Sequence, residues 1–156
     1  MARYLADEPL AAIYASSMKR AQETAAPLAE AHGLEMSIVD DIAEFDRGLP
    51  FYIPGEEREP MNAEEMTAFF AAMTSDEFAQ RVERGLAKII AAHPGETVAA
   101  VCHGGVISNF LAKMFDQRSD YYFDSHYTAV TRIRASAASG RRTMVSFNEC
   151  HWLRDL

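Results

Sequence analysis

A short apolar run that ends in His-Gly-Gly and leads into a helix is the strongest constraint on the fold. Residues 97–101 read Thr-Val-Ala-Ala-Val, and residues 107–115 follow with the apolar spacing of a helix. A buried strand that leads directly into a helix is the repeating unit of a parallel α/β sheet. The two glycines after His103 leave backbone N–H groups uncovered at the helix start, where the helix dipole favours anions. The sequence therefore places an imidazole beside a predicted anion site.

A second junction of the same kind lies near the N-terminus. Residues 11–15 form a short apolar run, and a helix-forming segment follows it. Ser16 or Ser17 is the expected N-cap of this helix, which places Arg20 in its first turn. The planar guanidinium of arginine suits phosphate. Because ligands of open parallel sheets bind beyond the carboxyl ends of the strands, Arg20 and His103 are predicted to share one site.

Three blocks of sequence carry a resemblance to a known family. Residues 16–25 read Ser-Ser-Met-Lys-Arg-Ala-Gln-Glu-Thr-Ala, residues 102–106 read Cys-His-Gly-Gly-Val, and residues 147–153 read Phe-Asn-Glu-Cys-His-Trp-Leu. In this order and separation they resemble the histidine phosphatase superfamily, the phosphoglycerate-mutase-like proteins, over essentially the whole chain. Taken alone, His-Gly-Gly has a plainer interpretation, in which His103 ends a strand and the glycines make a turn. The blocks in combination are specific.

The resemblance implies an enzyme that hydrolyses or transfers a phosphate through a phosphohistidine intermediate. Arg20, His103 and the backbone N–H of Gly104 would hold the phosphoryl oxygens and stabilise their charge. No metal ion and no cofactor is expected. The expected partner is a small phosphorylated substrate, and the sequence does not separate phosphatase from mutase.

One departure from the family is large. The family's first strand ends in Arg-His-Gly, whose histidine is the nucleophile, and this chain has no Arg-His-Gly. Residues 1–10 are similar to the end of the family's first helix, so the first strand and the nucleophile are expected to be missing. Either the gene start was placed too far downstream, or the chain is a fragment. In both cases the chain as written is predicted to lack meaningful phosphomonoesterase activity.

A general acid is expected to complete the site. Glu44 and Gly48 are similar to the family's Glu-x-x-x-Gly segment. A carboxyl group held near negative charge keeps its proton more readily, and can then donate it to the leaving alkoxide. Glu44 is therefore predicted to be the acid, with Asp46 as the second candidate. The alternative is that Glu44 is a solvated carboxylate in a loop.

Composition restricts the class of partner. The 156 residues suit a single domain, and a net charge of −8 argues against nucleic acid and against an anionic membrane surface. No apolar stretch is long enough to span a bilayer, and no signal peptide is recognisable, so a cytoplasmic protein is expected. The two cysteines, Cys102 and Cys150, do not suggest a disulfide scaffold. Neither a metal site nor a nucleophilic Cys102 is expected, because adjacent strand residues point to opposite faces and no arginine closes the loop.

Strand and helix patterns that alternate along the chain predict a three-layer α/β/α domain over residues 1–156. Its sheet is expected to be mostly parallel, with an antiparallel C-terminal hairpin. A capping-box pattern at Asn62 and Glu65 marks one helix start, and Gly33 marks a helix end. The expected elements are a helix remnant at 2–8, strands at 11–15, 34–39, 97–102, 128–134 and 143–147, helices at 18–32, 63–73 and 105–115, and a loop at 45–61. A further helix is expected between a cap at Ser75 or Asp76 and a stop at Pro94-Gly95.

The family's first strand would lie inside the sheet, between 97–102 and 128–134. Without it, two rows of backbone N–H and C=O groups would lose their partners. We expect the chain to close this gap by moving the C-terminal hairpin, to borrow a strand from a second copy in a homodimer, or to be marginally folded.

Three functional hypotheses follow. The first is a phosphatase-family enzyme read from a late start. The second is a pseudoenzyme that binds a phosphorylated ligand or a protein partner without turnover. The third is an unrelated α/β enzyme with a chance His-Gly-Gly.

Overall fold

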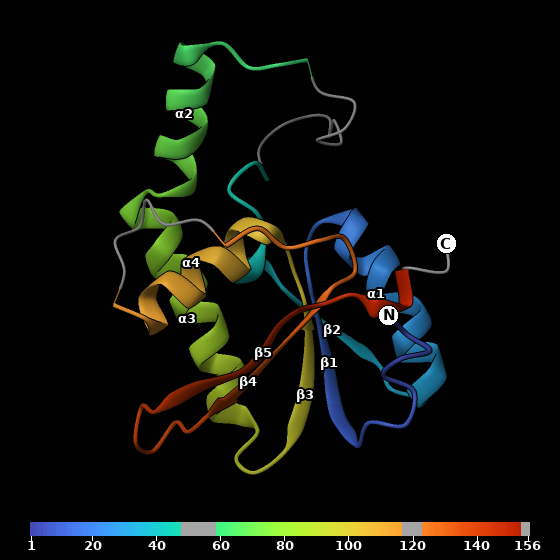
Figure 1. Cartoon of the computed structure of the whole chain (residues 1–156). Helices are drawn as coiled ribbons and strands as arrows, with labels where there is room; N and C mark the ends of the chain where they lie inside the picture. The colour runs from blue at the N-terminus through green and yellow to red at the C-terminus, as the bar shows by residue number, and fades with distance from the viewer. Residues whose placement is uncertain (48–58, 117–122, 154–156) are drawn as a thin grey trace.

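Alternating strands and helices build three layers, as the sequence predicts (Figure 1). The computed structural model describes residues 1–47, 59–116 and 123–153. Its central sheet has the strand order β2-β1-β3, and both pairings are parallel. The strands are β1 (Leu10–Ser16), β2 (Met36–Val39) and β3 (Thr97–Val101). Parallel pairing brings the carboxyl ends of all three strands to one edge of the sheet.

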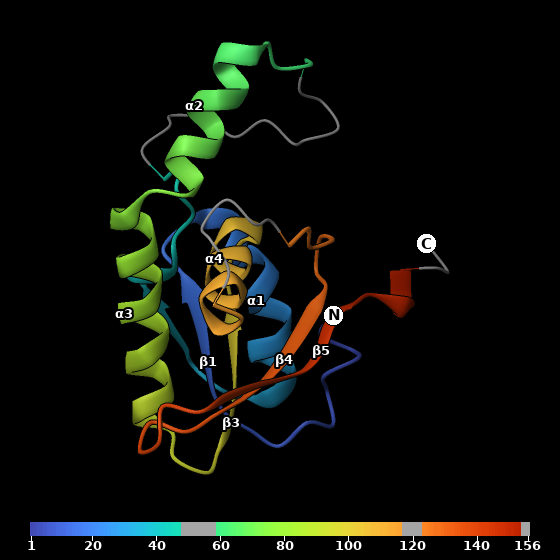
Figure 2. The same ribbon diagram turned by 60° about the vertical axis from the view of Figure 1, so that its left-hand side comes forward.

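Helices cover both faces of this sheet (Figure 2). Helix α1 (Lys19–His32) packs on one face, where Ala25 and Leu28 contact the residues of β1 and β3 that point that way. Helices α3 (Asp76–Ala92) and α4 (Gly104–Met114) pack on the other face. Because side chains alternate along a strand, Ala99 and Val101 join the first cluster, and Val98 and Ala100 join the second.

Local signals account for the helix ends. Asn62 and Glu65 form the predicted capping box of α2 (Ala63–Met73), and Ser75 caps α3. Gly33 ends α1 in the left-handed conformation, with φ 61°. The N-cap predicted for α1 is wrong, because Met18 occupies this position without a side-chain bond and Ser16 lies inside β1. Pro27 does not interrupt α1.

The first residues do not form the expected helix remnant. Residues 2–7 form turns instead, and the backbone bonds there close single turns only. Leu5 is buried in the cluster on the α1 face, and Tyr4 stacks on Trp152, in the short 3-10 helix His151–Leu153. These side-chain contacts fix the segment without a regular helix. Residues 48–58 of the predicted loop at 45–61 lie outside the described residues.

The C-terminal hairpin forms as predicted but does not close the sheet. Strands β4 (Val130–Ala135) and β5 (Arg142–Glu149) pair antiparallel with each other and form a separate two-stranded sheet. Among the described residues β4 does not pair with β3, so the expectation that the hairpin would move onto β3 is wrong. We call the space between β3 and β4 the strand gap. Borrowing of a strand and marginal stability stay predictions.

None of the helices in the described ranges is both long and apolar enough to cross a membrane.

Candidate functional site

His103 lies at the junction of β3 and α4. It is the N-cap residue of α4 and only 8% exposed. Its Nε2 atom is 2.6 Å from Ser16 Oγ at the end of β1. Burial, and after it the positive charge of Arg20, lowers the pKa of His103 to about 4. The imidazole is therefore neutral at pH 7, and one of its nitrogens carries a proton that can be donated.

Arg20 lies in the first turn of α1, as predicted from the sequence. Its Nη2 atom donates to Asp46 Oδ1 over 3.0 Å, and both side chains are largely shielded from solvent. Arg20, Glu44 and His103 line one cavity of about 1070 Å³, which also extends along β3 and β4. The structure thus brings together three predicted residues that the sequence separates widely. Their roles in this cavity stay a prediction.

Glu44 is a buried carboxyl group. Its side chain is close to the start of α4, where Oε2 accepts a hydrogen bond from the backbone N–H of Gly105 over 2.8 Å. Oε1 accepts a second bond from the N–H of Phe45 over 3.1 Å. The residue is 8% exposed, and this burial raises its pKa to about 7 in spite of the two bonds. The alternative of a solvated loop carboxylate is therefore wrong.

The sequence predicts an anion at the start of α4, and in the structure the Glu44 carboxyl contacts this helix start. Gly104 lines the cavity, as expected of a residue whose N–H would bind an anion. The nearest contact, however, is the bond of the following residue, Gly105, to the Glu44 carboxyl. A side chain of the protein thus takes part of the N–H set that would otherwise face a ligand.

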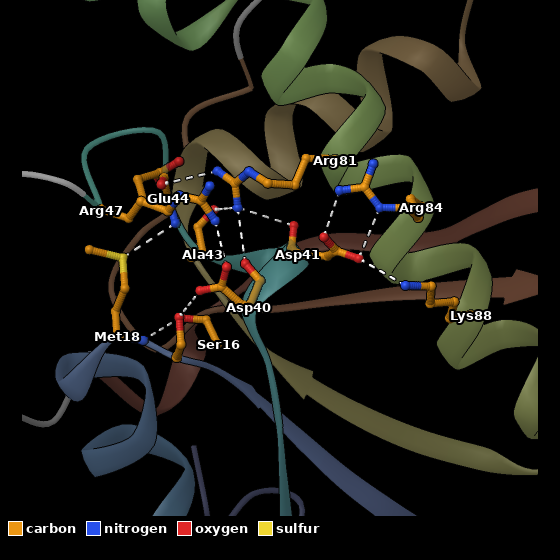
Figure 3. Close-up of polar contacts among 11 residues, drawn as sticks. Ser16, Met18, Asp40, Asp41, Ala43, Glu44, Arg47, Arg81, Arg84 and Lys88 are labelled. Carbon is orange, nitrogen blue, oxygen red and sulfur yellow. Dashed lines mark hydrogen bonds and ion pairs between the residues drawn. The ribbon is translucent and has the colours of Figure 1, made fainter.

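A buried arginine fixes the segment that carries Glu44 (Figure 3). Arg81, on α3, donates through Nη1 and Nη2 to backbone carbonyl oxygens over 2.8–3.3 Å; they belong to Asp40, Asp41, Ala43 and Glu44. The carbonyl oxygens of Asp40 and Glu44 also accept from the backbone N–H groups of Ala43 and Arg47, and the single guanidinium adds a donor to each of the four oxygens. Arg81 is only 7% exposed, so these bonds are shielded from water. Arg81 thus binds the backbone of the segment that carries Glu44.

Two further ion pairs hold the outer end of this segment. Asp41 pairs with Arg84 over 2.7 Å and with Lys88 over 3.2 Å, and both cations project from α3. These bonds lower the pKa of Asp41 below its ordinary value. Arg84 and Lys88 are exposed, so their contribution to stability is expected to be small.

Sequence reasoning missed the parts played by Ser16 and Arg81. Ser16 was expected as a helix cap, and it instead contacts His103 and accepts from the N–H of Met18 over 3.1 Å. Its position at the end of a strand next to Arg20 could have indicated a site residue. No local signal identifies Arg81, because its partners are backbone carbonyls about forty residues earlier in the chain.

The remaining candidates for chemistry are weaker. Burial raises the pKa of the Cys102 thiol to about 12, so it stays protonated and unreactive. Within the described ranges, no three histidine, cysteine, aspartate or glutamate side chains come together as a metal site would require. The arrangement therefore offers an arginine, a neutral imidazole and a helix start to an anion, and a carboxyl group able to exchange a proton near neutral pH.

Comparison with known proteins gives a consistent family. Residues 1–149 match the family model described as histidine phosphatase superfamily (branch 1). No curated protein matches the chain in sequence.

Several solved structures share the fold. The mycobacterial glucosyl-3-phosphoglycerate phosphatase in complex with VO3 superimposes with a TM-score of 0.70 at 18% identity, over 96% of this chain and 81% of that one. Phosphoserine phosphatase from Entamoeba histolytica, in complex with 3-phosphoglyceric acid, gives 0.70 at 19% identity, over 97% and 80%. The protein YhfR from Bacillus stearothermophilus gives 0.67 at 22% identity, over 96% and 79%.

Proposed function

The chain belongs to the histidine phosphatase superfamily, and from this premise we propose that its cavity binds the phosphoryl group of a small phosphorylated substrate. The observation that carries the proposal is the buried Glu44 carboxyl at the start of α4, with its pKa raised to about 7 beside Arg20 and His103. A small organic phosphate is the substrate class, in keeping with the 3-phosphoglyceric acid held by the Entamoeba protein.

Arg20 and His103 hold the phosphoryl oxygens in this proposal. The guanidinium supplies charge and paired donors, and the neutral imidazole supplies one N–H. The N–H of Gly104 at the start of α4 adds a third donor in this proposal. The ligand competes with two carboxylates of the protein, since Asp46 pairs with Arg20 and Glu44 contacts Gly105.

Glu44 supplies the proton. In a form that contains the family's nucleophilic histidine, this histidine would form the new bond to phosphorus as the bond between phosphorus and the substrate oxygen breaks. The leaving oxygen would then take the proton of the Glu44 carboxyl. The resulting carboxylate then accepts a proton from the water that hydrolyses the phosphoryl intermediate. A pKa near 7 allows both steps at neutral pH, because neither form of the carboxyl is strongly favoured.

We propose in addition that the 156-residue chain binds phosphate without turnover. The sequence has no Arg-His-Gly, the segment that the resemblance associates with the nucleophile. His103 faces Ser16 and is assigned to oxygen binding rather than attack. The same protein would then be a binding protein in this form and a phosphatase when a nucleophile is supplied.

Calorimetric titration with orthovanadate tests the binding site. Arg20→Ala and His103→Ala should each weaken binding at least about tenfold, the effect expected when a charge-assisted donor is removed. Lys19→Ala is the matched control, because Lys19 precedes Arg20 on the same helix and its side chain is 87% exposed. Unchanged affinity in both site variants would show that the site is assigned wrongly.

Hydrolysis of an aryl phosphate tests the proposal that the 156-residue chain binds phosphate without turnover. The purified chain should show no turnover above the background rate. Robust turnover that His103→Ala abolishes would show that another residue of this chain acts as nucleophile. That result would leave the binding proposal intact and overturn the proposal of an inactive chain.

A further inference from the structure

Apolar side chains stand beside the proposed acid. Phe45 follows Glu44 directly in the chain, and its backbone N–H donates to the Glu44 carboxyl over 3.1 Å. Phe69 and Met73, from the second half of α2, line the same cavity as Phe45, Glu44 and His103. We call Phe45, Phe69 and Met73 the apolar wall. None of the three belongs to β3 or β4, the strands that border the strand gap.

Edge-to-face ring contacts connect this wall to the core. The centroid of the Phe45 ring lies 5.0 Å from that of Phe69, at an interplanar angle of 87°, and 6.0 Å from that of Phe78, at 77°. Phe78, on α3, is buried and belongs to the core cluster on that face of the sheet. Aromatic rings attract one another in this geometry. The core thus supports Phe45, and Phe45 in turn contacts the helix that carries Phe69.

Helix α2 contributes to the cavity through one end only. It stands beyond the carboxyl edge of the sheet in both views of the molecule (Figures 1 and 2). Residues 63–68 are exposed and do not line the cavity, whereas Met73 is buried, and Asn109 on α4 donates to its backbone oxygen over 3.4 Å. Phe69 and Met73 are four positions apart and share one face of the helix. The cavity therefore receives two apolar side chains and no charge from α2.

The position of Glu44 determines which part of a substrate would meet this wall. A carboxyl group protonates a leaving oxygen only within hydrogen-bond distance, at most about 3.2 Å. In the proposed site the phosphoryl group lies on one side of that oxygen, toward Arg20 and His103. The carbon bonded to the oxygen lies on the other side, so the organic group begins next to Glu44 and next to Phe45.

We infer that the apolar wall binds the organic part of the substrate, which makes the substrate a phosphate monoester of an apolar alcohol, preferably one with an aromatic ring. The assignment rests on the proposed phosphate site and on Glu44 as its acid. Two rings and a thioether pack well against an aromatic group. The same side chains offer no hydrogen-bond donor, so a hydroxyl or carboxylate placed against them would lose its water without compensation.

Three phosphonates, which are not hydrolysed, test the wall by calorimetric titration. Methylphosphonate, phenylphosphonate and phosphonoacetate present a methyl group, a ring and a carboxylate beside the same anionic head. Phenylphosphonate should bind at least about tenfold more tightly than methylphosphonate, because its ring buries apolar surface against the wall. Phosphonoacetate should bind no more tightly than methylphosphonate, because the wall has no donor for its carboxylate.

One variant shows whether the wall carries this preference. Phe69→Ala removes a ring from the wall, so the ratio of the phenylphosphonate and methylphosphonate affinities should fall below about threefold. Met66→Ala is the matched control, because Met66 lies on the same helix, is 39% exposed and does not line the cavity. This variant should keep the full ratio of the parent chain.

NMR of the methionine methyl groups gives a second measurement, in the chain without substitutions. The ring current of phenylphosphonate should shift the methyl resonance of Met73, since Met73 belongs to the wall. Methylphosphonate has no ring and should shift it much less. The resonance of the exposed Met66 should stay in place with either ligand.

The possible outcomes separate the wall from the phosphate site. Equal affinities for phenylphosphonate and methylphosphonate, both weakened by Arg20→Ala, would overturn the apolar substrate and leave the phosphate site intact. A phenyl preference that Phe69→Ala does not reduce, or a Met73 resonance that phenylphosphonate does not shift, would overturn it as well. Methylphosphonate binding that neither Arg20→Ala nor His103→Ala weakens would instead overturn the phosphate site, and the assignment of the wall with it.

Discussion

The candidate cavity has two sides that differ in how their backbone is held. On one side lies the segment 40–47, of which residues 44–46 line the cavity. Four of its carbonyl oxygens, those of residues 40, 41, 43 and 44, accept hydrogen bonds from the buried Arg81. On the other side lie the edges of β3 and β4, which do not pair with each other in the described part of the chain. We call these the closed side and the open side.

The difference shows what kind of group can replace a missing backbone partner. One arginine satisfies a short irregular segment, because its donors fan out over oxygens that lie close together. No such side chain can serve a strand edge, where donors and acceptors alternate over the length of the strand. A strand edge needs another strand. The closed side is therefore held by a side chain, whereas the described part of the chain supplies no strand between the two edges of the open side.

The largest expected effect comes from breaking the closed side. Arg81→Met removes the guanidinium donors of the carbonyl oxygens of residues 40, 41, 43 and 44, of which the bonds to Ala43 and Glu44 are buried. The free energy of unfolding should fall by roughly 3 kcal/mol, the effect of orphaning more than one buried polar group. Urea unfolding measures this change. Arg84→Met is the control, because Arg84 lies on the same helix but is exposed, and its loss should cost much less.

The Arg81 prediction also concerns the pKa of Glu44. If Arg81 positions the segment, Arg81→Met should bring the pKa of Glu44 down toward its ordinary value of 4.5 as the carboxyl becomes hydrated. An NMR titration of the Glu44 carboxyl would show this. A destabilised variant in which the pKa of Glu44 stays near 7 would mean that Arg81 supports the fold without positioning the acid.

The second prediction uses the opposed titrations of Glu44 and His103. The raised pKa of Glu44 means that the folded state holds a proton more tightly, so this stabilisation is complete below pH 4.5 and is lost as the pH rises to about 7. The lowered pKa of His103 stabilises the fold above pH 6.5 and is lost as the pH falls to about 4. Each contribution is on the order of 3 kcal/mol at most.

Single variants separate the pH dependence of stability that comes from Glu44 from the one that comes from His103. Relative to the parent chain, the stability of Glu44→Gln should improve as the pH rises from 4.5 to 7, because the destabilising ionisation of Glu44 is gone. The stability of His103→Gln should instead improve, relative to the parent, as the pH falls from 6.5 to 4. Urea unfolding at a series of pH values measures the difference in the free energy of unfolding between each variant and the parent chain. Parallel pH profiles for all three proteins would contradict the burial argument for both residues.

The sequence predicts local features of this molecule well. The capping box at Asn62 and the left-handed Gly33 are encoded within a few residues, and both are confirmed. The helix remnant at 2–8 is wrong because tertiary contacts of Tyr4 and Leu5, rather than helix propensity, determine that segment.

The candidate site likewise has features that the sequence predicts and features that depend on tertiary structure. Arg20, His103 and Glu44 stand at element ends that the sequence marks, so their shared cavity could be anticipated from the order of strands. The bonds of Arg81 to distant carbonyls and the pairing of Arg20 with Asp46 could not, because both depend on how separate elements meet. That β4 pairs only with β5 in the described residues likewise depends on tertiary structure.

The third prediction tests how tightly the closed side is packed at the start of α4. A Cβ atom added at Gly105 would overlap Glu44 Oε1 and lie 3.0 Å from Glu44 Cδ. Gly105→Ala should therefore lower the free energy of unfolding by about 2 kcal/mol, since a close-packed interior resists added volume. Urea unfolding measures the loss. Combining it with Glu44→Asp, which shortens the side chain, should give a smaller loss than the sum of the two single variants. Strict additivity would show that the two residues do not conflict.

The smallest expected effect concerns Asp46, a residue of the closed side that lines the cavity. Its carboxylate pairs with Arg20 over 3.0 Å and adds negative charge where the proposed anion binds. Asp46→Asn removes this charge and leaves the Arg20 guanidinium more available to a ligand, so vanadate affinity should rise about threefold, as expected for a partly screened charge.

Asp41→Asn is the matched control, because it makes the same change of charge at a carboxylate that pairs with Arg84 and Lys88. If both variants raise affinity equally, the gain reflects overall charge. If Asp46→Asn weakens binding instead, its carboxylate orients Arg20 for the anion rather than competing with it.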